Sequence, residues 1–176
     1  MLTSLFSESH MNLIEQKKWI GIDEKLFITH SLERFFERKL SARQRANFLG
    51  NNFDRIEKTI NVSIQSGRQV DDINELYIRF GTFDYDRKNG KQIIIARISF
   101  KEKKQKKGNG ISLLLKLCEI AEKFDYKTIR FEASNKNCRN FCKKLGFSDS
   151  CSISRADLIF NLHDYLFKKS AEKYLF

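Results

Sequence analysis

A glycine-rich, basic stretch in the second half of the chain has the residue types best suited to binding an anion. It reads QKKGNG from Gln105 to Gly110 and opens directly into the apolar run ISLLLKL. The first turn of a helix leaves about four backbone N–H groups unpaired and carries roughly half a positive charge, which suits it to a phosphate. The stretch therefore predicts an anion site at a helix start. A turn that binds nothing is the alternative.

The net positive charge of the chain lies in the same half. Residues 1–90 carry 14 Lys and Arg against 13 Asp and Glu, net +1, whereas residues 91–176 carry 19 against 9, net +10. Five of these lysines lie between Lys101 and Lys107. This distribution favours an anionic ligand, a nucleic acid or an acidic protein surface. Lysines that only keep the protein soluble are the plainer explanation.

Regular elements on both sides of the stretch predict how it is positioned. ELYIRFGTF (75–83) and KQIIIARISF (91–100) predict two antiparallel strands joined by a turn at Asn89 and Gly90. The helix after the loop has a periodic apolar stripe, made of Ile111, Leu114, Leu115, Cys118, Ala121 and Phe124. KTIRFEA (127–133) predicts the next strand. A crossover of this kind should place it parallel to Ile93–Phe100.

The segments before residue 71 predict mainly helices. We expect a short strand at Leu26–Thr29 and a helix at Leu32–Leu40. Phe53, Ile56, Ile60 and Ile64 recur at spacings of three and four, which predicts an amphipathic helix over 42–65 that a glycine closes.

The C-terminal end predicts a mixture of elements. A helix is expected at Asn135–Leu145, because Gly146 supplies a stop. ADLIFNL (156–162) predicts a late strand, and the segment 163–176 predicts a closing helix or an added strand.

A second block of motif residues follows the glycine-rich loop. It reads NKNCRNFCKKLGF over 135–147. Together with Gln105–Gly110, which matches Q/R-x-x-G-x-G/A, this block resembles the GNAT superfamily of acyl-CoA-dependent N-acyltransferases, whose second block is usually an asparagine, a small residue and then F/L-Y-x-K-x-G-F. The residues that fill the places of both blocks beyond the loop are Leu113, Leu114, Leu117, Asn135, Cys138, Phe141, Lys144, Gly146 and Phe147. The resemblance covers about Ile93–Phe147.

The resemblance implies an α/β (α+β) fold: a mixed, mostly antiparallel central sheet, with one parallel strand pair that splays apart, flanked by helices. It implies a single domain over 1–176, in which a helical part, 1–70, borders the acceptor site and 71–176 is the coenzyme A-binding core. In that family the helices before the sheet border the acceptor pocket, so residues 31–66 are expected to decide the substrate.

The same resemblance assigns the cofactor contacts. The pyrophosphate of coenzyme A would rest on the loop, with contacts from Gln105, Lys106, Lys107, Gly108, Asn109, Gly110, Ile111 and Ser112. Glycines are expected at 108 and 110 because a Cβ would hold the backbone away from the phosphates. The pantetheine arm would pair with the strand edge Ala96–Phe100, including Ile98 and Phe100. Asn135 and Phe141 would contact the arm from the other side, and Lys144 completes the set.

The candidate catalytic residues are Cys142 and Glu132. Cys142 stands where the family often has a tyrosine whose hydroxyl protonates the thiolate of coenzyme A. A thiol, with an ordinary pKa of about 8.5, can also donate a proton. The alternatives are a cysteine packed as a small hydrophobe and a transient acyl-cysteine. Glu132, near a strand end, is the candidate base, with Glu75 second. A surface carboxylate is the plainer reading of each, and His30 and His163 have no spacing that links them to the loop.

The function expected from these residues is transfer of an acetyl (acyl) group from acetyl-CoA to a primary amine by direct attack in a ternary complex. The amine-bearing acceptor would be a small molecule, a protein or an aminoacyl-tRNA. The alternative is a catalytically impaired module of this fold that binds RNA or an acidic protein. Arg34–Arg45, which mixes arginines with Phe35 and Phe36, is the best candidate for a nucleic-acid contact, and an amphipathic helix explains it equally well.

Composition sets the remaining expectations. The four cysteines form no C-x-x-C pair and have no histidine at zinc spacing, so we expect reduced thiols and no metal. No run approaches the roughly 20 apolar residues of a membrane span, and no leader is apparent. We therefore expect a cytoplasmic protein with no membrane partner, with a homodimer as a candidate assembly.

Overall fold

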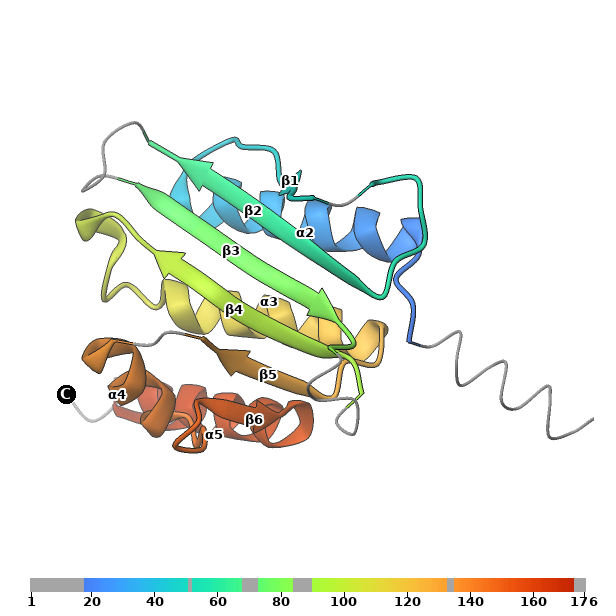
Figure 1. Ribbon diagram of the computed structural model, residues 1–176. Coiled ribbons are helices and arrows are strands. Elements are labelled where there is room, and N and C mark those ends of the chain that lie inside the picture. Colours follow the sequence, from blue (N-terminus) through green and yellow to red (C-terminus); the bar gives the residue numbers. More distant parts are fainter. Residues whose placement is uncertain (1–17, 51, 68–72, 84–89, 133–134, 173–176) are drawn as a thin grey trace, which may run out of the picture.

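The computed structural model describes residues 18–50, 52–67, 73–83, 90–132 and 135–172. These residues form one open six-stranded sheet with helices packed against it (Figure 1). The elements in chain order are α2 (Ile22–Leu40), β1 (Asn47–Phe48), β2 (Thr59–Ser66), β3 (Asn74–Gly81), β4 (Gln92–Ser99), the 3-10 turn η3 (Glu102–Lys104), α3 (Asn109–Lys123), β5 (Thr128–Phe131), α4 (Lys136–Lys144), β6 (Ser152–Ser154) and α5 (Arg155–Glu172).

The strands lie in the sheet in chain order, from β1 to β6. Neighbouring strands from β1 to β4 are antiparallel, β5 runs parallel to β4, and β6 is antiparallel to β5. The prediction of a mixed, mostly antiparallel sheet with one parallel pair is therefore confirmed. So are the predicted hairpin strands β3 and β4, the crossover helix α3 and the parallel strand β5. Of the predicted hairpin turn, Asn89 lies outside the described residues.

One face of the sheet carries the helix layer. Figure 1 shows α2, α3 and α5 behind the strands, and α3 packs between the other two. Buried and half-buried residues alternate along β2 and β3, so each strand directs every second side chain into the core. Burial of this apolar face supplies the main driving force for the fold.

Two predictions in the N-terminal part are wrong. The strand expected at Leu26–Thr29 lies inside α2, because Ile28 and Leu32 sit one helical turn apart and both face the core. The helix expected over 42–65 is replaced by β1, a loop and β2. A spacing of four residues is also two strand repeats, so Ile60 and Ile64 face the core from a strand with Val62 between them.

The late strand predicted at Ala156–Leu162 is also wrong. The segment belongs to α5, where Leu158 and Leu162 are buried one turn apart. The late strand is the shorter β6 just before it, and of the two forms expected for 163–176 the described part, up to Glu172, is helical. Among the helices in the described ranges, none combines the length and the apolar character needed to cross a bilayer.

Candidate functional site

The parallel strands β4 and β5 pair over only the first half of β4. Their register runs from Gln92 opposite Thr128 to Ile95 opposite Phe131, and the Glu132 N–H donates to Ile95 O at 3.0 Å. Beyond that point, Ala96–Ser99 continues β4 beside β3. Within the described part of the chain no strand pairs with this segment on its other side. The chain therefore has an open backbone edge inside its sheet.

A bulge marks the point where the two strands separate. Arg97 lies opposite Tyr77 and Ile95 lies opposite Ile78, so Ala96 is one extra residue in β4. A bulge bends its strand and increases the local twist. The divergence of β4 from β5 thus has a local cause, which the sequence pattern of β4 does not reveal.

The glycine-rich loop leads from this edge into the start of α3. Gly108 is the N-cap residue with φ +78°, and Lys106 is also in the left-handed region, with φ +55°. Since a glycine cap has no side chain, it leaves the first N–H groups of α3 uncapped. A Cβ built on Gly108 meets no atom within 4 Å, so the space in front of the cap is open.

Two amides of the loop fix its shape from within. Gln105 Nε2 donates to Phe100 O at 2.8 Å, and Asn109 Nδ2 donates to Lys104 O at 2.7 Å. Both side chains are therefore used to brace the loop. Contacts to a phosphate would come from the N–H groups and from the lysines.

Gly110 lies directly against an aromatic ring of the second motif block. A Cβ at this position would lie 3.1 Å from Phe141 Cζ, so the glycine makes room for an aromatic ring of α4. Phe141 in turn packs edge-on against Phe131 of β5, with ring centroids 6.4 Å apart. The two motif blocks thus meet where the parallel strands diverge.

A basic pocket adjoins the loop on the side of α2. Its volume is about 670 Å³, and its lining residues are Lys39, Leu40, Ser41, Ala42, Ser66, Gly67, Asn74, Lys101, Lys103, Lys104, Lys107 and Asn109. Five of these are lysines, and no described carboxylate belongs to the lining. Lys104 Nζ donates to Lys39 O at 3.3 Å and to Ser41 Oγ at 3.1 Å, which ties the end of α2 to the loop. The pocket focuses positive potential beside the uncapped helix start.

The other residues predicted to contact the cofactor lie around the loop, on β4, α3 and α4 and beside them. Ile98 and Phe100 are half-buried on the open edge, and Phe100 packs against Phe35. Ile111 is buried in the core and Ser112 is half-buried behind the loop. Asn135 is the N-cap of α4, with Oδ1 accepting from the Cys138 N–H at 2.9 Å. Lys144 is exposed in the last turn of α4, where a positive charge suits the helix dipole.

Cys142 is buried one helical turn from the half-buried Cys138. Its hydrogen bond to Cys138, followed by burial, raises the pKa of the Cys142 thiol well above its ordinary value. The same hydrogen bond lowers the pKa of Cys138. Cys138 is therefore the more acidic thiol of the pair, although in the motif it only fills the place of a small residue. All four cysteines are free thiols.

Glu132, the candidate base, is part of an ion pair. Its carboxylate forms an ion pair with Arg79 of β3, and the Arg79 guanidinium lies 5.7 Å from the centroid of the Phe83 ring. Glu75 is likewise paired with Arg97, at 3.0 Å. Arg79 was not found from the sequence, because it is 53 residues from Glu132 and belongs to no motif.

The Arg34–Arg45 stretch has an arrangement unlike the expected nucleic-acid contact. Phe35 and Phe36 are buried core residues, so neither ring is free to stack on a base. The polar side of α2 instead borders an open pocket of about 660 Å³, lined by His30, Glu33, Arg34, Glu37, Arg43, Gln44, Arg45 and Asn47. Mixed charges line this second pocket.

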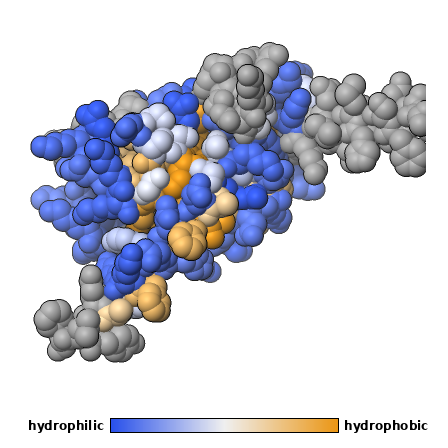
Figure 2. Space-filling view, turned by 90° about the horizontal axis from the view of Figure 1, so that it is seen from below, coloured by the Kyte–Doolittle hydropathy of each residue, from blue (hydrophilic) through white to orange (hydrophobic). Residues whose placement is uncertain are grey.

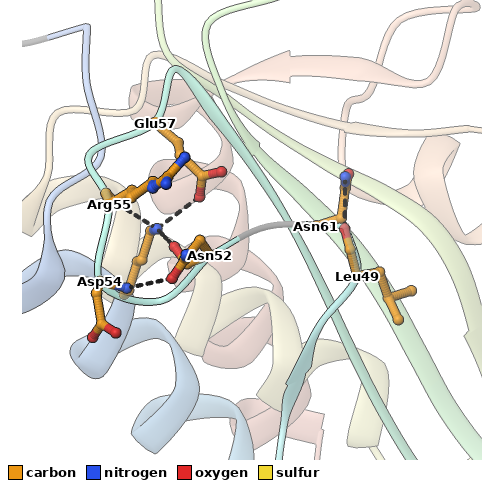
Figure 3. A network of polar contacts seen from close by, with 7 residues as sticks. Leu49, Asn52, Asp54, Arg55, Glu57 and Asn61 are labelled. Atoms are coloured by element: carbon orange, nitrogen blue, oxygen red, sulfur yellow. Dashed lines mark hydrogen bonds and ion pairs between the residues drawn. The ribbon is translucent and has the colours of Figure 1, made fainter.

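The opposite end of the sheet holds buried charges that pattern analysis missed. Lys25 is fully buried, and its ammonium donates to Asn52 O, to Arg55 O at 2.6 Å and to Glu57 Oε2 at 2.7 Å (Figure 3). These contacts hold the loop before β2 against α2.

A second buried cluster lies beside it. Lys91 Nζ contacts both carboxylate oxygens of Glu24 at 2.7 Å, and the Tyr126 hydroxyl donates to the same carboxylate. Burial lowers the pKa of Lys91, an effect that Glu24 opposes, and burial raises the pKa of Tyr126 well above its ordinary value. The partners are far apart in sequence, so no local spacing could have paired them.

Among the described residues, no group of three or more His, Cys, Asp or Glu side chains is placed to hold a metal ion. The chain matches no protein-family model, and no curated protein matches it.

Proposed function

We propose that the protein is an N-acyltransferase of the GNAT type that uses acetyl-CoA to acylate a primary amine. One observation carries the proposal. The uncapped start of α3, in a glycine loop flanked by lysines, lies against Phe141 of the second motif block, where β4 separates from β5. A helix start suited to a phosphate and a strand edge that no described strand pairs with therefore lie side by side, which supports a ligand with a pyrophosphate and an extended amide arm.

The residues fit such a ligand at both of its ends. The first N–H groups of α3 and Lys107 would hold the pyrophosphate, and the lysine-lined pocket beside them would take the ribose phosphate. The backbone edge Ala96–Ser99 would pair with the pantetheine amides, as an added strand does. Acetyl-CoA would supply the activated thioester. The preorganised backbone amides would fix its orientation.

Direct attack requires a neutral amine and a proton for the departing thiolate. Cys142 is the candidate donor, since its thiol keeps its proton at neutral pH. The same high pKa makes it a weak acid, so we expect Cys142→Ala to lower kcat by less than the roughly 100-fold of a well-matched general acid. Cys142→Ser, which keeps a donor, should retain more activity than Cys142→Ala. Equal turnover in wild type and both variants would remove Cys142 from the mechanism.

Glu132 can act as the base only when its carboxylate is free of the ion pair with Arg79. Since Arg79 binds its carboxylate, the acceptor amine would have to compete with a guanidinium. Arg79→Gln tests this point. Faster turnover in the variant would support Glu132 as the base, and slower turnover would assign the pair to structure.

Calorimetric titration with acetyl-CoA tests the proposal. We expect one-site binding with a Kd on the order of micromolar or tighter, lost in Gly108→Trp because the bulky side chain fills the space in front of the cap. Gly50→Trp is the matched control: Gly50 has φ +72° and open space around its Cβ, so the backbone strain is the same at a distant loop. Absence of binding by the wild-type chain would overturn the proposal.

A second function has its own supporting observations. The protein could instead be a chain of this fold that has lost catalysis and binds RNA or an acidic protein. Three features fit this function: the lysine-lined pocket, the ion pair of Glu132 with Arg79 and the burial of Cys142. Retention of RNA without coenzyme A, falling steeply as salt rises, would favour this function. Turnover of any amine acceptor would reject it.

A further inference from the structure

A row of side chains crosses the face of the sheet that is turned away from α2, α3 and α5. The register places Arg79 of β3 opposite Ile94 of β4, Ile94 opposite Arg130 of β5, and Arg130 opposite Ser152 of β6. Ile129, next to Arg130, belongs to the core under the helices. Because successive residues of a strand point to opposite faces, the row lies on the side of the sheet that Figure 1 shows in front of the helices.

The charges on this face of β3, β4 and β5 are paired, with one exception. Arg97 forms an ion pair with Glu75 at 3.0 Å, and Arg79 forms one with Glu132. The half-buried side chain of Arg130 has no hydrogen bond or ion pair with another of the described residues. One guanidinium of the row is therefore left over.

Buried polar atoms without a partner gather at the same place. In the described part of the chain, three buried side-chain nitrogen or oxygen atoms lack a hydrogen-bond partner, namely Arg79 Nε, Thr128 Oγ1 and Arg130 Nε. Thr128 is two residues before Arg130 on β5, so it points to the same face. Buried polar groups are costly to leave unpaired. Two of the three atoms are guanidinium N–H donors, which an oxyanion would satisfy.

We propose that Arg130, with Arg79 beside it, binds an oxyanion of the amine acceptor, a carboxylate or a phosphate. The inference rests on the acyl transfer proposed above. A guanidinium offers a planar pair of N–H donors that matches both groups. The backbones of Arg79 and Arg130 are two strands, about 10 Å, apart, so both side chains can reach one group above Ile94. The substrate class is then amines that carry an acid group.

The row lies next to the candidate base. Glu132 follows Arg130 by two residues, about 6.6 Å along β5, and its N–H donates to Ile95 O at the last contact before the two strands separate. An acceptor held by its acid group at Arg130 would place an amine a few bonds away beside Glu132 and the open edge. Its acid group would also compete with Glu132 for Arg79, which would release the carboxylate to act as a base.

The surroundings of the row are polar. β6 forms the edge of the sheet beside it, and Ser152 and Ser154 face the same side as Arg130. Figure 2, which views the molecule from this edge, shows mainly hydrophilic surface around a limited apolar area. A small charged ligand suits such surroundings.

Acceptors with and without an acid group test the proposal. In steady-state transfer from acetyl-CoA, γ-aminobutyrate is compared with γ-aminobutyramide, and phosphoethanolamine with ethanolamine. We expect the KM of the acidic member to be lower by about 10-fold or more in at least one pair, because its hydrogen bonds to the arginines are charge-assisted. The pair that shows the difference identifies the acid group as a carboxylate or a phosphate.

Variants of two arginines on the same face locate the effect. Arg130→Gln should abolish the preference for the acidic member without changing kcat for the neutral one, and Arg130→Lys should recover part of it. Arg97→Gln is the matched control: it changes the net charge equally, but Arg97 is paired with Glu75, so the preference should remain. Thermal unfolding of each variant confirms that it is folded.

Two results would overturn the proposal. One is equal KM values for acidic and neutral acceptors in wild type, and the other is a preference that survives in Arg130→Gln. If acetyl-CoA binds and transfer shows no such preference, the acyltransferase stands and the site at Arg130 does not.

If acetyl-CoA fails to bind, the proposed function fails and the site is tested by itself. NMR line broadening of γ-aminobutyrate and of phosphoethanolamine then measures their binding to the protein. Broadening by wild type that is lost in Arg130→Gln and kept in Arg97→Gln would support the site. Broadening of neither compound would reject it.

Discussion

Lysine side chains have different surroundings at the two ends of the sheet. At one end, Lys25 and Lys91 are buried and held by the carboxylates of Glu57 and Glu24. At the other end, five lysines line a pocket with no described carboxylate in its lining. Removal of one partner from a buried ion pair is costly, whereas lysines that line a pocket without a carboxylate among the lining residues raise the local positive potential, which favours an anion. Unfolding should therefore respond to changes at the first end and ligand binding to changes at the second.

Glu24→Gln should have the largest effect on the free energy of unfolding. It leaves the buried Lys91 without its carboxylate, which typically costs 3–5 kcal/mol. We expect about 3 kcal/mol, since Lys91 already has a lowered pKa and can release its proton. Denaturant unfolding measures the loss, with Glu37→Gln as the control because Glu37 pairs with Arg43 at the surface. An equal loss of acetyl-CoA affinity in folded protein would contradict the division between the two ends.

Tyr126→Phe tests the same cluster through the pH dependence of the free energy of unfolding. Loss of the hydrogen bond to Glu24 should cost about 1.5–3 kcal/mol near neutral pH. The folded pKa of Tyr126 is raised above 10, so its contribution to stability is complete below pH 10 and falls as pH rises further. The stability difference between wild type and variant should therefore shrink in alkaline solution. A difference that grows above pH 10 would show that the folded pKa of Tyr126 is not raised.

Substitutions in the lysine-lined pocket should have the smallest effect, and they should change only the binding of acetyl-CoA. Lys103→Ala with Lys107→Ala should weaken acetyl-CoA binding roughly 3-fold to 10-fold and reduce its salt dependence, because two charges near the phosphates are lost. Stability should be unchanged. Lys169→Ala, on the exposed part of α5, is the control. Identical calorimetric affinities in all three proteins would place the ligand away from this pocket.

Local patterns predicted the elements around the loop better than those before it. The hairpin strands, α3 and β5 each have one clear period and one clear stop, so the sequence was enough to find them. Over 42–65 the apolar spacing fits a helix and a strand alike, and only the pairing of β2 with β3 decides between them. The same limit explains the error at Ala156–Leu162.

For the candidate site, the glycine loop and Phe141 were predictable as motif residues, but their mutual contact was not. The room that Gly110 leaves for Phe141, the bulge at Ala96 and the pairing of Arg79 with Glu132 all join residues distant in sequence. Neither hydrophobic period nor motif spacing carries that information. Three-dimensional packing supplies it.

Lys104 gives the loop a mechanical connection to α2. Its ammonium holds the carboxyl end of α2 through Lys39 O, and its own carbonyl accepts from Asn109, the first residue of α3. One residue thus links the last turn of one helix to the first turn of another. Any group that orders the loop also restricts fraying at the end of α2, which slows amide exchange there. A ligand bound at the loop should therefore also slow amide exchange in the last turn of α2, which hydrogen exchange with and without acetyl-CoA would measure.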